Sequence, residues 1–299
     1  MGQGLAKNYP QARLLYEEAD AILGFSLSDL CFEGPAKVLN DTINTQPAIF
    51  VTSLAVMRVL EAEDWLQPPV MAVPAMVAGH SLGELTALVA AGAMDFGAGL
   101  HLVRERGRLM KLAGEQSPGG MAAVLKMDDT EVEEACKEAA GETGRAVQIA
   151  NYNSPGQVVI SGDKEALTRA IELLRERGGR RIIPLAVSIA AHSPLMASVV
   201  EKYRAAVDDT PMRTPDMQVV ANISARPLLG VDEIRDELAG QLTWPVRWTA
   251  SMQWMVEQRV TRFVEVGPGQ VLSKLMRRIE PGVEAVSVGD MASMEALTQ

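Results

Sequence analysis

The hexapeptide GHSLGE, from Gly79 to Glu84, constrains the fold of this chain more than any other stretch. It follows the apolar run AMVA and precedes LTALVAAGAM, a segment of small and apolar residues with helical spacing. A strand that enters a helix through Gly-x-Ser-x-Gly turns so sharply that we expect no side chain to be tolerated at either flanking glycine. The pattern predicts a strand over 75–78, a helix over 82–91, and either a nucleophile or a structural turn at Ser81.

The middle of the chain predicts a small subdomain of its own. After the turn-rich stretch GEQSPGG, strand-like runs and helical segments follow in the order β-α-β-β-α-β, with helices expected over 130–140 and 164–177. This is the order of the ferredoxin-like unit, which is compact enough to be inserted into a larger fold. We therefore expect a small subdomain over 117–186 and a large, discontinuous subdomain over 1–116 and 187–299.

Helices alternate with apolar strands on both sides of this insertion. MQVVANI, TRFVEVG and EAVSV have the composition of buried strands, and WTASMQWMVEQ and QVLSKLMRR have helical spacing. PAIFVTSLAVMRVLEA predicts a helix with Pro47 in its first turn, where the missing N–H is tolerated. The predicted fold class is α/β, with helices on a mostly parallel sheet.

Charge and composition exclude several classes of function. The net charge of -10 over 299 residues argues against nucleic-acid or membrane-surface binding, since both need a basic excess. The two cysteines have no metal-ligand spacing, so no metal site is expected. The amino terminus lacks a signal-peptide pattern, and Pro, Gly or charged residues interrupt every long apolar run. We therefore expect a cytoplasmic protein without a nucleic-acid or membrane partner.

A serine nucleophile at Ser81 needs a general base, and the chain has three histidines. His80 adjoins the serine in the turn, where its side chain should point away, and His101 lies within a predicted helix. His192 precedes Ser193-Pro194, a pattern typical of a helix start, and the positive end of the helix dipole would keep the ring neutral. His192 is the candidate base, the alternative being a histidine that merely ends a loop.

Arg106 shares the apolar stripe of its predicted helix. Within LHLVRERGRLM, Val103, Arg106 and Met110 have the spacing i, i+3, i+7, which places them on one helix face. A guanidinium on the inward face needs an anion, either a structural carboxylate, which is the usual outcome, or the carboxylate of a substrate. The neighbouring Arg104 and Arg108 are interpreted as solvated charges.

Six motifs in order, GHSLGE, RERGRLM, NYNSPGQVVISG, AHSPLM, GQLTWPVRW and EVGPGQVL, resemble the malonyl-CoA:acyl-carrier-protein transacylase family over nearly the whole chain. The resemblance implies an α/β-hydrolase-like core with an inserted ferredoxin-like subdomain. It also implies transfer of malonyl from malonyl-CoA to the phosphopantetheine thiol of acyl carrier protein, for fatty-acid biosynthesis. It implies no metal or redox cofactor, and we expect a monomer.

The resemblance also implies roles for residues of the reacting centre. Ser81 is acylated, His192 is its base, and Arg106 pairs with the free carboxylate of the malonyl group. Gln241 matches the position whose backbone carbonyl orients the histidine, in place of the aspartate of a hydrolase triad. The N–H of Leu82 holds the developing oxyanion.

Two asparagines match family positions that line the cleft between the subdomains, namely Asn151 and Asn153. The stretch NSPGQ, which begins with Asn153, is equally typical of a turn between two strands. A binding role and a structural role therefore both remain open for this pair.

The amino terminus departs from the family pattern. Members begin with a strand and a Gly-Gln-Gly loop whose glutamine lines the oxyanion hole, whereas MGQGLAKNYPQAR matches the segment that follows this loop. We therefore expect this chain to lack that strand and loop, with an open sheet edge and a rate lowered by a factor of about 100 to 1,000.

Other functions remain as alternatives. One is a trans-acting polyketide-synthase acyltransferase for malonyl or methylmalonyl groups, since IAAH lacks a bulky aromatic residue beside His192. A serine hydrolase would need an acid between Ser81 and His192. A truncated, inactive form would still bind carrier protein.

Overall fold

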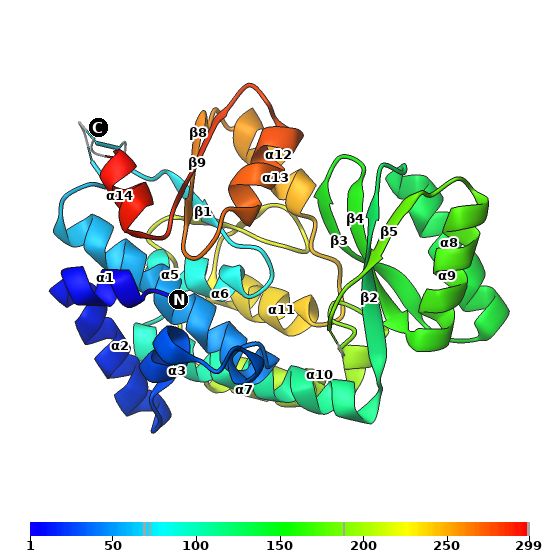
Figure 1. Cartoon of the computed structure of the whole chain (residues 1–299), viewed down its shortest axis with the longest axis horizontal. Coiled ribbons are helices and arrows are strands. Elements are labelled where there is room, and N and C mark those ends of the chain that lie inside the picture. The colour runs from blue at the N-terminus through cyan, green and yellow to red at the C-terminus, as the bar shows by residue number, and fades with distance from the viewer. Residues whose placement is uncertain (68–69, 72, 188, 298–299) are drawn as a thin grey trace.

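A four-stranded sheet with two helices lies at one end of the molecule, beside a larger and mainly helical part (Figure 1). The computed structural model describes residues 1–67, 70–71, 73–187 and 189–297. The first and last helices, α1 (Gln3–Asn8) and α14 (Met291–Leu297), lie in the larger part, away from the four-stranded sheet. The order of elements is that of an α/β protein, as the sequence predicts.

The strands of the larger part form two sheets, each with one parallel pair. β1 (Met76–Ala78) pairs in parallel with β6 (Gln218–Val220), and β7 (Pro227–Leu228) pairs with β6 in the antiparallel direction. β8 (Arg262–Val266) and β9 (Glu284–Val288) form the second parallel pair. The register of β1 and β6 matches Ala78 with Val220, so both strands end at the same edge.

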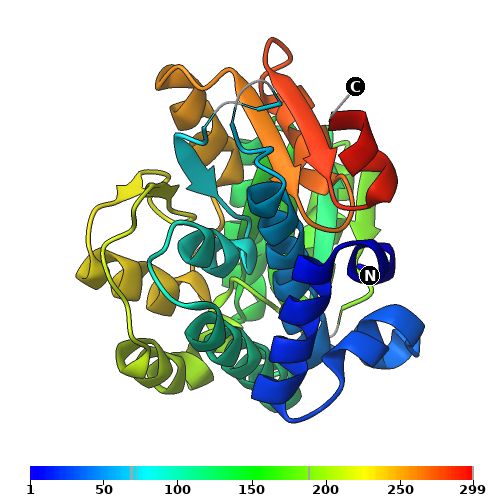
Figure 2. The ribbon, with the colours of Figure 1, turned by 90° about the vertical axis from the view of Figure 1, so that its left-hand side faces the viewer.

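Helices surround these strands, and the amino-terminal ones face the viewer in Figure 2. The central helix α5 packs against α2, α6 and α7, and buries most of its residues. The helices outside the four-stranded unit are α1 (Gln3–Asn8), α2 (Pro10–Leu23), α3 (Leu27–Glu33), α4 (Ala36–Leu39), α5 (Thr42–Ala62), α6 (Gly83–Ala90), α7 (Phe96–Gln116), the short 3₁₀ helix η1 (Pro194–Met196), α10 (Ala197–Asp209), α11 (Val231–Gln241), α12 (Trp248–Glu257), α13 (Val271–Ile279) and α14 (Met291–Leu297).

Helix α5 begins one turn earlier than the sequence predicts. The Asp41 side chain caps the helix by accepting the Ile43 N–H at 3.2 Å, so Pro47 lies inside the helix rather than in its first turn. Proline has no N–H to donate to the carbonyl four residues earlier. The half-buried Arg104 donates to that Ile43 carbonyl instead, at 2.5 Å, and so it is not the solvated charge that we expected.

Length and composition alone would let α5 cross a membrane, the one such helix among the described residues. Its apolar window has a mean hydropathy of 1.2, but 67% of that window is buried inside the protein. The helix packs against several other helices and against β8 (Arg262–Val266), which is the environment of a core helix.

The four-stranded sheet has the order β3-β4-β2-β5, with all neighbours antiparallel. This is the arrangement predicted for the β-α-β-β-α-β segment. The helices α8 and α9 cover one face, and their apolar residues form a hydrophobic cluster with the sheet. The elements are β2 (Gly119–Leu125), α8 (Asp129–Thr143), β3 (Val147–Ser154), β4 (Gln157–Asp163), α9 (Lys164–Glu176) and β5 (Arg181–Pro184).

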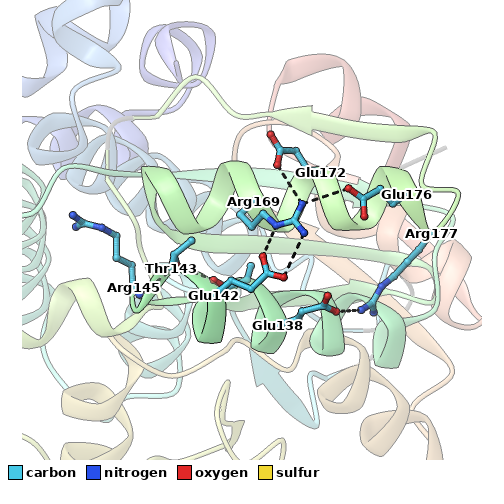
Figure 3. A network of polar contacts seen from close by, with 9 residues as sticks. Glu138, Glu142, Thr143, Arg145, Arg169, Glu172, Glu176 and Arg177 are labelled. Carbon is cyan, nitrogen blue, oxygen red and sulfur yellow. Dashed lines mark hydrogen bonds and ion pairs between the residues drawn. The ribbon is translucent and has the colours of Figure 1, made fainter.

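Charged side chains link the outer faces of α8 and α9 (Figure 3). Arg169 contacts Glu142 at 2.5 Å and two glutamates of its own helix, while Arg177 contacts Glu138. These side chains lie at the surface and are partly exposed, and surface ion pairs contribute about 1 kcal/mol or less each. The buried apolar cluster is therefore the main source of stability in this unit.

Candidate active site

Ser81 lies in a strained turn between β1 and α6. Its φ is 54°, in the left-handed region, which costs a residue with a Cβ about 1–2 kcal/mol. A Cβ on Gly79 would lie 1.9 Å from the carbonyl oxygen of Gly83, so this position requires glycine. A Cβ on Gly83 would meet nothing within 4 Å, so our expectation for that glycine was wrong. In this turn the backbone of Gly83 comes close to the Cα of Gly79, whereas the space beside the Cα of Gly83 is open.

His192 contacts Ser81 on one side of its ring and a carbonyl on the other. Nε2 lies 2.8 Å from Ser81 Oγ, and Nδ1 lies 2.7 Å from the backbone oxygen of Gln241. Ser193 caps the following η1 turn by accepting the Leu195 N–H at 3.3 Å. Burial, and then the charge of Arg106, lower the pKa of His192 to about 3. The ring is therefore neutral and can accept a proton from the serine.

Arg106 is buried beside the serine, with only 1% of its surface exposed. Nη1 donates to Gln46 Oε1 at 2.7 Å, and Nη2 donates to Gln241 Oε1 at 2.7 Å and to Ser81 Oγ at 3.1 Å. All three acceptors are neutral, and Nε has no hydrogen-bond partner in the described part of the chain. Burial lowers the pKa of Arg106, partly offset by Tyr203 and Glu84, but a guanidinium stays charged in proteins. The site therefore contains a buried cation without a directly bonded anion.

The other predicted site residues lie around this centre. Leu82 follows the serine at the start of α6, where the first N–H groups of a helix have no partner within it. Asn153 Oδ1 lies 2.8 Å from His80 Nε2, which links β3 to the turn that carries Ser81. Asn151 is buried in β3 and forms a bridge with Val246.

The remaining histidines have other surroundings. His101 is exposed on the surface of α7. His80 forms its hydrogen bond with Asn153 and lies 5.5 Å from the ring of Trp248. Of the three histidines, the structure brings His192 to the Ser81 hydroxyl.

Sequence reasoning missed four residues that complete the network. Glu84 is the last residue of GHSLGE, Gln46 directly precedes Pro47, and Asn222 follows the buried strand β6. Polar residues after parallel strands meet at the same sheet edge, and this signal could have placed Asn222 beside the serine. Gln148 of β3 donates to the backbone oxygens of His192 at 2.8 Å and of Thr243 at 3.0 Å, a contact that no sequence pattern indicates.

The geometry supports nucleophilic chemistry at a serine. A neutral imidazole within hydrogen-bond reach activates the hydroxyl, and the adjacent guanidinium can bind an anionic part of a substrate. Across residues 1–67, 70–71, 73–187 and 189–297, no group of three or more His, Cys, Asp or Glu side chains could hold a metal ion. The fold and this site define a serine enzyme that transfers acyl groups.

Comparison with known proteins gives the family. Residues 1–295 match the family described as "Acyl transferase domain". The malonyl CoA-acyl carrier protein transacylases of Haemophilus influenzae and Escherichia coli K12 are 40% and 41% identical over 295 and 292 residues, which is 99% and 98% of this chain and 92% of each relative. The chain belongs to the acyltransferase family, in the group of malonyl-CoA:acyl-carrier-protein transacylases.

A solved structure supports the same assignment of the fold. A malonyl-transacylase in complex with a type II polyketide-synthase acyl-carrier protein is 38% identical and superposes with a TM-score of 0.94. The match covers 99% of this chain and 94% of that one.

Proposed function

We propose that this chain transfers the malonyl group of malonyl-CoA to the phosphopantetheine thiol of acyl carrier protein, for fatty-acid biosynthesis. The observation that carries the proposal is the buried guanidinium of Arg106, whose Nη2 lies 3.1 Å from Ser81 Oγ. A malonyl group has a free carboxylate close to its reacting carbonyl. When that carbonyl is bonded to Ser81 Oγ, the guanidinium of Arg106 is close enough to bind the carboxylate. The names of the relatives, which are 40% and 41% identical to this chain, support the same reaction.

In the first half-reaction, His192 Nε2 takes the proton of Ser81 Oγ as the oxygen attacks the thioester carbonyl. The Leu82 N–H donates to the oxyanion that develops on that carbonyl. The carbon–sulfur bond then breaks, and CoA leaves as its thiol with the proton from His192. In the second half, the carrier-protein thiol gives its proton to His192 and attacks the carbonyl of the malonyl ester. The bond from that carbonyl carbon to Ser81 Oγ then breaks, and His192 returns the proton to Oγ.

Arg106 selects the acyl group in this proposal. Nε has no hydrogen-bond partner among the described residues, and acylation of Ser81 converts the hydroxyl that Nη2 contacts into an ester oxygen, a weaker acceptor. Nε and Nη2 then offer two N–H groups to one carboxylate, the two-pronged geometry typical of arginine. An acetyl group makes neither hydrogen bond.

The carbonyl of Gln241 takes the place of a triad carboxylate. It accepts the Nδ1 proton of His192 at 2.7 Å and so fixes the tautomer in which Nε2 accepts. A carbonyl stabilises imidazolium less than a carboxylate would. This partner argues against the serine hydrolase alternative, which needs an acid at that ring nitrogen.

The remaining assignments complete the proposal. Asn151 and Asn153 line the acyl cleft between a large part, 1–116 and 187–299, and a small part, 117–186. The reaction exchanges one thioester for another and transfers no electrons, so it needs no redox cofactor, and the proposal includes no metal. The protein acts as a cytoplasmic monomer, with acyl carrier protein and malonyl-CoA as its partners.

A polyketide-synthase role is the second candidate, because one similar structure is a transacylase bound to a type II polyketide-synthase carrier protein. The two roles differ in the carrier protein that is used. Rates of malonyl transfer to a fatty-acid carrier and to a polyketide carrier, measured side by side, would separate them.

The test of the proposed function is the mass of the intact protein after brief mixing with malonyl-CoA. We expect one malonyl adduct that maps to the peptide containing Ser81 and disappears when carrier protein is added. Ser81→Ala should form no adduct, while Ser117→Ala, which changes a serine outside the site, should form it normally. An adduct of unchanged yield in Ser81→Ala would refute the nucleophile.

A further inference from the structure

A buried carboxyl group lies beneath the serine turn and contacts none of the three groups that react. Glu84, in the first turn of α6, has no exposed surface. Its Oε1 accepts the backbone N–H of Asn222 at 2.8 Å and the side-chain Nδ2 of Asn222 at 3.2 Å. Its Oε2 accepts the side-chain Nε2 of Gln241. Glu84 thus holds two side-chain amides at once.

Asn222 joins Glu84 to the backbone of the serine turn. Its Oδ1 accepts the Ser81 N–H at 2.7 Å, and its Nδ2 donates to the Gly79 carbonyl at 2.7 Å. A side-chain amide has one accepting and one donating end. Because Glu84 occupies the donating end, the accepting end is directed at Ser81.

Gln241 joins Glu84 to the guanidinium of Arg106 through its side chain, and its backbone oxygen contacts the base His192. Its Nε2 donates to the Ser81 carbonyl at 3.0 Å as well as to Glu84, and its Oε1 accepts from Arg106 Nη2 at 2.7 Å. A rotated Gln241 amide would present its NH₂ group to the guanidinium, where two donors would face each other. Because the carboxyl group of Glu84 accepts from Gln241 Nε2, the other end of that amide, Oε1, faces Arg106 Nη2.

A second carboxyl group, that of Glu237, lies near Glu84 and acts on its pKa. Burial, and then the neighbouring Glu237, raise the pKa of Glu84. Three N–H groups nevertheless point at the two oxygens of Glu84, so the carboxyl group acts as the acceptor in all three of these hydrogen bonds. Glu237 in turn accepts the N–H of Ile223, the residue after Asn222, at 2.7 Å.

We propose that Glu84 is a positioning residue for acyl selection: it fixes the amide of Gln241, and through Gln241 it sets Arg106 for the carboxylate of the acyl group. The inference rests on the proposed function, since it assumes a malonyl group on Ser81. Glu84 acts without touching substrate.

The test compares malonyl-CoA and acetyl-CoA as they compete for the same enzyme sample. The ratio of malonyl to acetyl adduct on Ser81 does not depend on how much of the sample is folded. Glu84→Gln replaces one acceptor oxygen with an NH₂ group that must face a donor of Asn222 or of Gln241. We expect this ratio to fall at least tenfold.

Glu265→Gln is the matched control, because Glu265 also accepts two backbone N–H groups, those of Leu272 at 3.0 Å and Ser273 at 2.8 Å, but contacts no residue of the site. Its ratio should equal that of the unaltered protein. If Glu84→Gln gives no folded protein, Glu84→Asp replaces it, since the shorter carboxylate cannot reach both amides and the same fall is expected.

A double-mutant cycle tests the route through Gln241. In a Gln241→Met background, which keeps the backbone carbonyl for His192, the further change Glu84→Gln should leave the ratio unchanged. An unaltered ratio in the single Glu84 variant, or an equal fall in the Gln241→Met background, would overturn the proposal. Failure of the unaltered protein to form a malonyl adduct would instead reject the proposed function.

Discussion

Replacing Arg106 with alanine removes the group that we propose to recognise the malonyl carboxylate. The side chain is 1% exposed, and its three hydrogen bonds go to neutral acceptors, so none of these bonds is to a structural carboxylate. The change deletes the cation and leaves Ser81 and His192, with their 2.8 Å contact, in place. It should therefore affect acyl groups that carry a carboxylate far more than those that do not.

The structure sets the size of this effect. Within the part of the chain that the structure describes, Nε has no hydrogen-bond partner, and Nη2 contacts Ser81 Oγ, so two N–H groups are available to a carboxylate once Ser81 is acylated. A hydrogen bond to a charged group contributes about 1.5–3 kcal/mol, so two contribute roughly 3–6 kcal/mol. Each 1.36 kcal/mol changes a rate tenfold, which predicts a loss in kcat/KM for malonyl of about 10² to 10⁴.

The assay measures kcat/KM for malonyl-CoA and for acetyl-CoA with the unaltered protein and Arg106→Ala. We expect the malonyl value to fall at least about 100-fold and the acetyl value to change less than about tenfold. Gln46 and Gln241 each lose a donor, so Tm should also fall, and both rates are normalised to folded enzyme. An equal loss for both substrates would refute carboxylate recognition by Arg106.

Three other perturbations test separate parts of the site. Gly79→Ala should prevent folding of the serine turn, whereas Gly83→Ala should keep Tm and activity; equal Tm losses in thermal melts would contradict the 1.9 Å contact predicted for a Gly79 Cβ. Since the pKa of His192 is lowered to about 3, its ring stays neutral above pH 4, so the acylation rate should be flat from pH 8 to 5. A histidine with its ordinary pKa would lose about 30-fold over that range, and a rate limb near pH 6.5 would contradict the burial argument. Gln148→Ala frees two carbonyls, one of them on His192, and should slow malonyl and acetyl transfer about equally; a change in their ratio would contradict a role limited to the base.

Local patterns predicted the elements that carry the site. The strand and helix around Ser81 lie at Met76–Ala78 and Gly83–Ala90, because apolar spacing and the steric limits of a sharp turn act between neighbouring residues. Arg106 was placed on an inward helix face by its spacing from Val103, and all but 1% of its surface is buried.

Other features needed the tertiary structure. Pro47 predicted a helix start, but a distant side chain, Arg104, donates to the carbonyl that proline leaves unpaired. Equally, Gly83 looked as constrained as Gly79, and only the path of the backbone shows which Cβ position is filled. Such compensation comes from residues far away in the chain and leaves no local pattern.

The sequence by itself determined the α/β class, the ferredoxin-like insertion, the acyltransferase family and the strand–turn–helix around Ser81, because these depend on apolar period, local sterics and motif order. The tertiary structure alone decided the partners of the site. The hydrogen bonds from Arg106 to Gln241, from Ser81 to Asn222 and from Gln241 to Glu84 join residues 135, 141 and 157 positions apart. Their distances follow from the parallel register of β1 with β6 and from helix packing, both of which involve the whole chain.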